Sequence, residues 1–342
     1  MSPVSDELKR RAMRPRLKFG RGILSELSSE WGKYVVVTQP PAWDRAKSML
    51  SREPESVLFV KSMERKKVEA AEKRLPDSEN IIGIGGGAAL DMAKFVGWKR
   101  RIEPVLVPGI ASVDACVTNA IAVRDKGKVH YIGFVLPRTI ICDFKLMSGA
   151  PRHFNRAGIG DILSIHTGVF DWGLAAEAGE VEFIKGVARQ AEALVDDLEE
   201  YAKDIHAVTD EALEFLIRAY AEENALCLKV GHPRSEEGSE HFFAYNVERL
   251  TGRNFVHGEL VSLGVFLMSR LQDNQHERIK GILDKTGVRY QPRALGLKRK
   301  EVEKALLTLP VYVKEEDLFF SVINEKGLNQ HILEALLGGL RF

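Results

Sequence analysis

The chain has 342 residues, of which 45% are hydrophobic and 28% are charged. This composition is ordinary for a soluble globular protein and excludes a disordered chain, a collagen-like repeat and a small disulfide scaffold. The 49 basic and 48 acidic side chains leave a formal net charge of +1, so no global charge attracts nucleic acid or an anionic membrane. At roughly 100–200 residues per domain, the length predicts two domains.

Neither membrane insertion, export nor disulfide bonding is indicated. No uninterrupted apolar run approaches the ~18 residues of a transmembrane helix, and the charged N-terminal stretch lacks the apolar segment of a signal peptide. The three cysteines, Cys116, Cys142 and Cys227, form no CxxC pair. We therefore expect packed thiols, a reducing cytoplasmic compartment, no membrane span and no nucleic-acid partner.

Strands and helices alternate in the first half of the chain. Short β-branched runs, each bounded by turn or polar residues, are separated by stretches of about ten residues with helical character. This alternation predicts βαβ units and a mostly parallel sheet. Strands are expected at 33–38, 56–60, 80–84 and 104–107, helices at 41–50, 65–74 and 88–98, and a β-hairpin at 120–124 and 129–136 with its turn at 125–128.

The second half changes character. From about Asn155 onward apolar residues recur at helical spacing, as in 183–201, 211–230 and 261–272, and strand-like runs nearly vanish. The expected architecture is an α/β domain of the nucleotide-binding type at 1–154 followed by an all-helical domain at 155–342.

A glycine-rich loop is the most informative feature of the first half. Gly85, Gly86 and Gly87 follow an apolar strand and lead directly into a helix. Backbone without Cβ atoms can approach an anion closely, and the N–H groups that open the helix point at it, so the loop favours a pyrophosphate. The alternative is a tight turn with no ligand. Gly83-x-Gly85-x-x-Ala88 also fits a GxGxxA pattern, but it follows the third expected strand, not the first, and carries little weight.

Two histidines and one aspartate stand at expected helix starts in the second half. Asp161 follows two glycines, His241 follows a Gly-Ser turn, and His257 precedes Gly258 and Glu259. Two imidazoles and a carboxylate suit a divalent transition metal with an open position. The spacing is long, however, and a capping Asp with two packed histidines is the alternative. His166, one turn after Asp161, is a further candidate to line the site.

Taken together, the motifs resemble the metal-dependent polyol dehydrogenases, a superfamily that includes glycerol dehydrogenase, iron-containing alcohol dehydrogenases and dehydroquinate synthase. The order and separation of the motifs carry the resemblance, and its nearest branch is sn-glycerol-1-phosphate dehydrogenase. The matching stretches are GGGAALDMAK (85–94), PGIASVD (108–114), AGIGDILSIHTGVFDWGLA (157–175), and GSEH with HGE.

The resemblance implies a dehydroquinate synthase-like fold, a homo-oligomer, a place in lipid metabolism and a small polyol or triose-phosphate substrate. It implies that Asp161, His241 and His257 hold zinc, or else nickel or iron, and that Asp114 orients a substrate hydroxyl. The implied contacts to NAD or NADP come from Gly85, Gly86, Gly87, Ala88, Ala89, Gly109 and Ser112, with Thr118 nearby.

The chain departs from this branch around the expected substrate. Ile165 stands where a Lys is common, Tyr245 replaces a substrate-contacting His, and Val113 replaces the His of a Ser-His-Asp triplet. We expect Tyr245 one turn from His241, where its hydroxyl donates to a substrate oxygen. The cationic groups considered for a substrate phosphate are Arg124, Arg156, Arg234 and Arg253.

Alternatives therefore stay open on substrate and cofactor. The sequence favours reduction of dihydroxyacetone phosphate; oxidation of an unphosphorylated polyol and a non-redox cyclisation are the alternatives. Gln39-Pro40-Pro41 follows the first expected strand without the acidic residue that would repel a 2′-phosphate, so we expect weak discrimination between NAD and NADP.

Overall fold

The computed structural model describes residues 6–125 and 128–342. Lys126 and Gly127, the centre of the expected hairpin turn, lie outside the described residues, as do residues 1–5. The chain divides into two compact units. The first comprises Met1–Asn155 with Val208–Ala225, and the second comprises Arg156–Ala207 with Leu226–Phe342.

A six-stranded parallel sheet forms the centre of the first unit, in the order β1-β8-β5-β4-β2-β3. The four strands expected from the sequence are confirmed, whereas β1 and β8 were not foreseen. They are β1 (Leu17–Gly20), β2 (Tyr34–Thr38), β3 (Ser56–Phe59), β4 (Asn80–Gly85), β5 (Val105–Pro108) and β8 (Thr139–Asp143). The strand order reverses direction between β2 and β4, where the glycine-rich loop follows β4.

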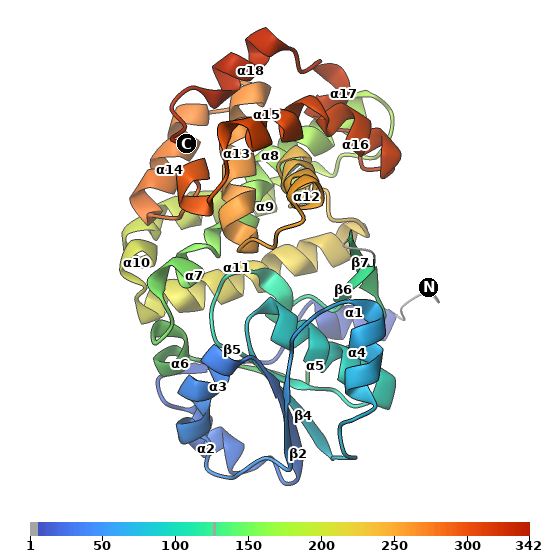
Figure 1. Ribbon diagram of the computed structural model, residues 1–342, viewed down its shortest axis with the longest axis vertical. Coiled ribbons are helices and arrows are strands. Elements are labelled where there is room, and N and C mark those ends of the chain that lie inside the picture. Colours follow the sequence, from blue (N-terminus) through green and yellow to red (C-terminus); the bar gives the residue numbers. More distant parts are fainter. Residues whose placement is uncertain (1–5, 126–127) are drawn as a thin grey trace. The chain divides into compact units, whose positions relative to one another are not determined.

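Helices connect these strands, as parallel pairing requires. The bounds are α1 (Asp6–Ala12), α2 (Leu24–Ser28), α3 (Pro40–Ala46), η1 (Lys47–Met49), α4 (Arg65–Glu72), α5 (Gly87–Arg100), η2 (Asp114–Cys116), α6 (Phe144–Ser148) and α7 (Arg152–Arg156). The expected hairpin is present as antiparallel β6 (Ile121–Asp125) and β7 (Lys128–Ile132). Figure 1 shows α5 beside β4, to which it connects through the loop.

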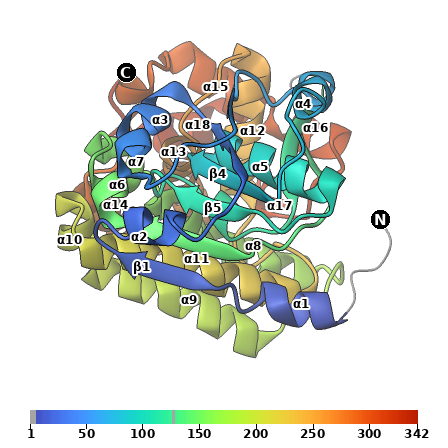
Figure 2. The same ribbon diagram turned by 90° about the horizontal axis from the view of Figure 1, so that it is seen from below.

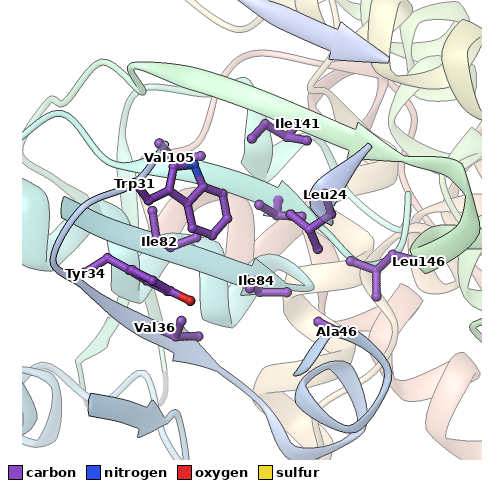
Figure 3. Close-up of a cluster of buried hydrophobic side chains, with 11 residues drawn as sticks. Leu24, Trp31, Tyr34, Val36, Ala46, Ile82, Ile84, Val105, Ile141 and Leu146 are labelled. Carbon is purple, nitrogen blue, oxygen red and sulfur yellow. The ribbon is translucent and has the colours of Figure 1, made fainter. Parts of the chain in front are cut away.

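One face of this sheet holds an apolar core, drawn in Figure 3. Alternate residues of a strand point to the same face, so Tyr34 and Val36 of β2 lie with Ile82 and Ile84 of β4. The Trp31 ring meets the Tyr34 ring edge to face, with centroids 5.3 Å apart. Each of these side chains is at most 4% exposed, and their burial holds the strands that carry the loop.

The second unit contains no strand among its described residues, and the expected helical character is confirmed. Helix α13 is buried along almost its whole length because α8, α12 and α14 pack around it (Figure 1). The bounds are α8 (Ile159–Glu177), α9 (Lys185–Glu200), α10 (Ala202–Ala207), α12 (Ser239–Thr251), α13 (His257–Gln272), α14 (His276–Thr286), η3 (Pro292–Leu295), α15 (Arg299–Leu307), α16 (Leu309–Glu315), α17 (Val322–Glu325) and α18 (Gln330–Leu337).

The assignment of helix α11 (Asp210–Val230) to a unit differs from the one expected from the sequence. The sequence assigned it to the helical domain, but residues 208–225 group with the first unit. Long-range polar contacts explain the difference. The Tyr220 hydroxyl donates to the Ala111 carbonyl at 3.2 Å, and the Asp210 carboxylate accepts a hydrogen bond from the guanidinium of Arg21. None of the helices in the described ranges is long and apolar enough to span a bilayer.

Candidate metal centre and dinucleotide loop

Asp161, His241 and His257 lie together in the second unit. Each offers a ligand atom, and these atoms lie within 4.8 Å of one another. Asp161 Oδ1 is 3.3 Å from His257 Nε2, and the two imidazole centroids are 5.3 Å apart. Asp161 and His241 are each 6% exposed, whereas the His257 side chain is 36% exposed. The three stand in the first turns of α8, α12 and α13, so three helix N-termini meet at one point.

Glycine contacts bring these helices together beside the three side chains. A Cβ on Gly160 would lie 2.5 Å from the Cα of Gly258, so α8 and α13 touch next to Asp161 and His257. A Cβ on Gly264 would lie 3.0 Å from the carbonyl carbon of Glu240, so α13 and α12 touch next to His241. No side chain larger than hydrogen fits at either contact, and the spacing of the three donors depends on both.

Glu240 orients the His241 ring from the buried side. Its carboxylate accepts hydrogen bonds from His241 Nδ1 at 2.8 Å, from the Thr167 hydroxyl at 2.6 Å and from the Gly238 amide at 2.6 Å. Nδ1 is thereby engaged, and Nε2 is the nitrogen left for a metal. Burial lowers the pKa of His241, but the hydrogen bond and charge of Glu240, with Glu237 and Asp161, outweigh it and raise the pKa to about 9.

This donor set fits a divalent transition metal. Two imidazole nitrogens and a carboxylate oxygen are three of the four ligands of a tetrahedral site, which leaves one position for a substrate. A carboxylate behind one imidazole is a common support for such a ligand. The metal must displace a proton from His241, because imidazolium has no lone pair to donate. The role of the three residues as ligands stays a prediction.

Tyr245 stands one turn after His241 on α12, at the expected place. Its ring centroid is 5.9 Å from that of His241, and its hydroxyl donates to Glu237 Oε1 at 3.0 Å. The phenol is half-buried, and its partner is an anion. Both side chains of this pair are polar, and neither of the two carries a positive charge that would attract a phosphate.

The other residues considered for the site make structural contacts. His166 Nε2 is bonded to the carbonyl of Asn274 at 2.9 Å, and burial lowers its pKa. Arg156 donates to the His206 carbonyl, and Arg253 pairs with Glu301 at 3.0 Å. Arg234 stacks on Phe319 and donates to the Phe320 carbonyl at 3.3 Å. The backbone amide of Arg124 donates to the Met63 carbonyl at 2.8 Å, a contact that does not involve its guanidinium.

The glycine-rich loop of the first unit has the geometry expected of a strand-to-helix turn. Strand β4 ends at Gly85, whose φ of 146° favours glycine. Helix α5 begins at Gly87, and its N-cap residue, Gly86, has no side chain that could cap the helix. The Gly109 amide donates to the Gly85 carbonyl at 2.8 Å, so the ends of β4 and β5, which run side by side in Figure 2, bring both predicted motifs together. The N–H groups of Gly87 and Ala88 open this 14-residue helix ahead of the Ala89 and Leu90 amides, which donate to the Gly86 carbonyl, and they suit a phosphate.

Ser112, Asp114 and Thr118 follow on the next segment. Ser112 is 8% exposed, and Asp114 begins η2 with its carbonyl accepting from the Val117 and Thr118 amides. Sequence reasoning missed the side chains that hold this segment. Asn155 accepts from the Ala111 amide at 2.9 Å, and Asn224 donates to the Val117 carbonyl at 3.4 Å. Both partners are distant in sequence, so no local pattern signals them.

Comparison with known proteins confirms the resemblance that the motifs predicted. Residues 36–151 match the family model described as "Iron-containing alcohol dehydrogenase". Two relatives carry the name "Glycerol-1-phosphate dehydrogenase [NAD(P)+]". That of Aeropyrum pernix is 29% identical over 89% of this chain and 88% of its own length, and that of Hyperthermus butylicus is 27% identical over 92% of both.

The fold is likewise shared with a solved structure. Glycerol dehydrogenase from Schizosaccharomyces pombe superposes with a TM-score of 0.70 at 22% sequence identity, covering 94% of this chain and 88% of that one. The expected architecture, an α/β unit with a parallel sheet and a helical unit, is thereby confirmed.

Proposed function

We propose that this chain is a metal- and NAD(P)-dependent polyol dehydrogenase that interconverts dihydroxyacetone phosphate and sn-glycerol 1-phosphate. The observation that carries the proposal is the convergence of Asp161, His241 and His257 within 4.8 Å. The names of the two relatives support the reaction class and the use of either dinucleotide. Of the candidate metals, zinc comes first, with nickel and iron as alternatives.

In this proposal some residues bind the cation and the dinucleotide, and others orient the substrate. Asp161, His241 and His257 hold the cation, with Glu240 fixing the ring of His241. A divalent cation held there would supply polarisation of a substrate oxygen, and a bound dinucleotide would supply or accept the hydride. Gly85–Ala89, Gly109 and Ser112 bind the dinucleotide through backbone and hydroxyl groups, and Asp114 orients a second substrate hydroxyl. The Tyr245 hydroxyl donates a hydrogen bond to Glu237 in the structure, and with substrate bound it would donate to a substrate oxygen instead.

A second candidate function is the oxidation of an unphosphorylated polyol such as glycerol. The Tyr245–Glu237 pair favours it, because an acidic pair one turn from His241 suits neutral hydroxyls better than a dianion. A non-redox cyclase related to dehydroquinate synthase is the remaining alternative, in which the dinucleotide is recycled. We further propose a cytoplasmic location, because three cysteines without a CxxC pair suit a reducing compartment, and a homo-oligomer, on the family resemblance alone.

The test is an assay at 340 nm with zinc or nickel, screening dihydroxyacetone phosphate, dihydroxyacetone, glycerol and glycerol phosphates with each dinucleotide. Faster turnover of dihydroxyacetone phosphate than of dihydroxyacetone is the expected result. A faster reaction with the unphosphorylated compound would select the second function, and no net absorbance change with any compound would favour the cyclase. In His257→Ala, metal content and turnover should both fall; persistence of both would show that the site is wrong.

A further inference from the structure

Residues 90–94, the last part of the GGGAALDMAK motif, have no role in the reaction described so far. Asp91 and Lys94 occupy it, one turn apart on α5. Lys94 is completely buried and Asp91 is 7% exposed, so both charges lie inside the first unit. The Lys94 ammonium is 2.7 Å from Asp91 Oδ1. A buried ion pair rarely stabilises a fold more than apolar side chains of the same volume. The groups that this pair contacts therefore indicate its role better than its own energy does.

The pair contacts alternate residues of a single neighbouring segment. Lys94 Nζ donates to the Ala120 carbonyl at 2.8 Å and to the Thr118 carbonyl at 3.1 Å. Asp91 Oδ1 accepts from the Ala122 amide at 3.3 Å. The segment from η2 to β6 is thus fixed to α5 at three points, and α5 itself begins at the glycine-rich loop.

Thr118 gains a defined hydroxyl orientation from the same ammonium. Its Oγ1 lies 3.4 Å from Lys94 Nζ, which has only protons to offer, so Oγ1 accepts in that contact. The hydroxyl proton of Thr118 is therefore directed to a different acceptor. Thr118 is half-buried, so its hydroxyl is within reach of a ligand.

We infer that Lys94, held by Asp91, is a positioning residue for dinucleotide binding, which acts by fixing Thr118 as a hydrogen-bond donor toward the cofactor. The inference rests on the proposed function, because it takes NAD(P) as the ligand of this segment. Lys94 does not touch the cofactor; it sets the place of the residue that does.

The test measures binding, not turnover. NADH and NADPH are titrated into the full-length wild type, Lys94→Met, Thr118→Val and the double variant, and the heat of binding gives the Kd. Lys94→Met should raise the Kd about tenfold. Thr118→Val should also raise it, and should add little in the Lys94→Met background, because both changes remove one interaction. Lys99→Met is the matched control: Lys99 lies on the same helix over the Trp98 ring, and its loss should leave the Kd unchanged.

Several outcomes overturn the inference. A folded Lys94→Met protein with a Kd within twofold of wild type would do so, and so would additive effects of Lys94→Met and Thr118→Val, which would mean that Lys94 supports the fold alone. If Lys94→Met does not fold, Asp91→Asn takes its place; it keeps an oxygen for Ala122 and loses only the charge, and a wild-type Kd for it would overturn the inference. Failure of the wild type to bind either dinucleotide would instead reject the proposed function itself.

Discussion

The backbones of Gly160 and Gly258 are in direct contact, and each glycine is the chain neighbour of a predicted metal ligand. The distance between Asp161 and His257 is therefore set by how closely α8 and α13 approach. A single added methyl group at this contact tests whether the donor spacing matters.

Gly160→Ala should separate the two helices and weaken metal binding. The new Cβ would lie 2.5 Å from Gly258 Cα, and backbone cannot move aside as a flexible side chain can. Overpacking of this kind costs about 1–3 kcal/mol of stability. Metal content after dialysis and urea unfolding measure the two effects. Gly173→Ala on the same helix is the control, because its Cβ has no atom within 4 Å, and it should keep its metal and lose no stability. Equal metal affinity in the two variants would contradict the prediction.

Glu240→Gln should weaken metal binding without disturbing the packing. The amide oxygen can still accept from His241 and Gly238, and the amide nitrogen can donate to Thr167. Only the negative charge that makes His241 a better ligand is lost. The zinc Kd, measured by competition with a chelator, should rise about 10–100-fold. Glu222→Gln removes the same charge at an exposed position of the first unit and should leave the Kd unchanged. An unchanged Kd for Glu240→Gln would show that the pair is only structural.

The sequence predicted the elements but not all of their partners. Residues with strong local patterns, such as Tyr34–Thr38 and Gly87–Arg100, lie close to the expected bounds. Strand β1 was missed because its four residues, LKFG, include no β-branched side chain, and because it pairs with β8, more than 100 residues later. Most of α11 belongs to the first unit because of contacts such as that of Tyr220 with Ala111. Such contacts produce no periodic pattern in the sequence.

Part of the candidate site could likewise be predicted from the sequence, and part could not. Chemistry-bearing residues such as His241 and His257 could be selected by residue type and by their place after turns. Their convergence with Asp161 was implied only by the family resemblance. Local patterns could not show it, because it depends on the close helix contacts at Gly160 and Gly264, and the sequence does not indicate which residue a glycine contacts. Arg156 and Arg253 show the reverse: both flank motifs, yet both bond to the chain itself.

Asp171 should make stability depend on pH between about 4 and 7. Burial, followed by the charge of Glu240, raises its pKa from 3.8 to about 7, although the Ser239 and Val322 amides donate to its carboxylate. In that window the folded chain binds more protons than the unfolded chain. The contribution of Asp171 to the free energy of unfolding is therefore fully present below about pH 4, falls as the pH rises, and is constant above about 7.

Asp171→Asn removes this titration. The free energy of unfolding of wild type minus that of the variant should decline from pH 4 to 7, with a slope of at most ~1.4 kcal/mol per pH unit. Urea unfolding at several pH values measures it. Asp197→Asn, at an exposed position of α9, should show no such slope. A constant difference between wild type and Asp171→Asn would mean that the carboxyl group does not titrate in this range.

Tyr245→His should shift the preference of the enzyme toward a phosphorylated substrate. The tyrosine hydroxyl donates to Glu237 and carries no positive charge, whereas an imidazole one turn from His241 can be protonated and can then pair with a phosphate. We expect the ratio of kcat/KM for dihydroxyacetone phosphate to that for dihydroxyacetone to rise about tenfold at pH 6, since a hydrogen bond to a charged group contributes roughly 1.5–3 kcal/mol. The gain should shrink at pH 8, where the imidazole is neutral. Tyr245→Phe is the control: it leaves Glu237 without this donor, so the ratio should fall below the wild-type value. If all three proteins give the same ratio at both pH values, position 245 does not face the substrate, and the phosphate must be recognised by other groups.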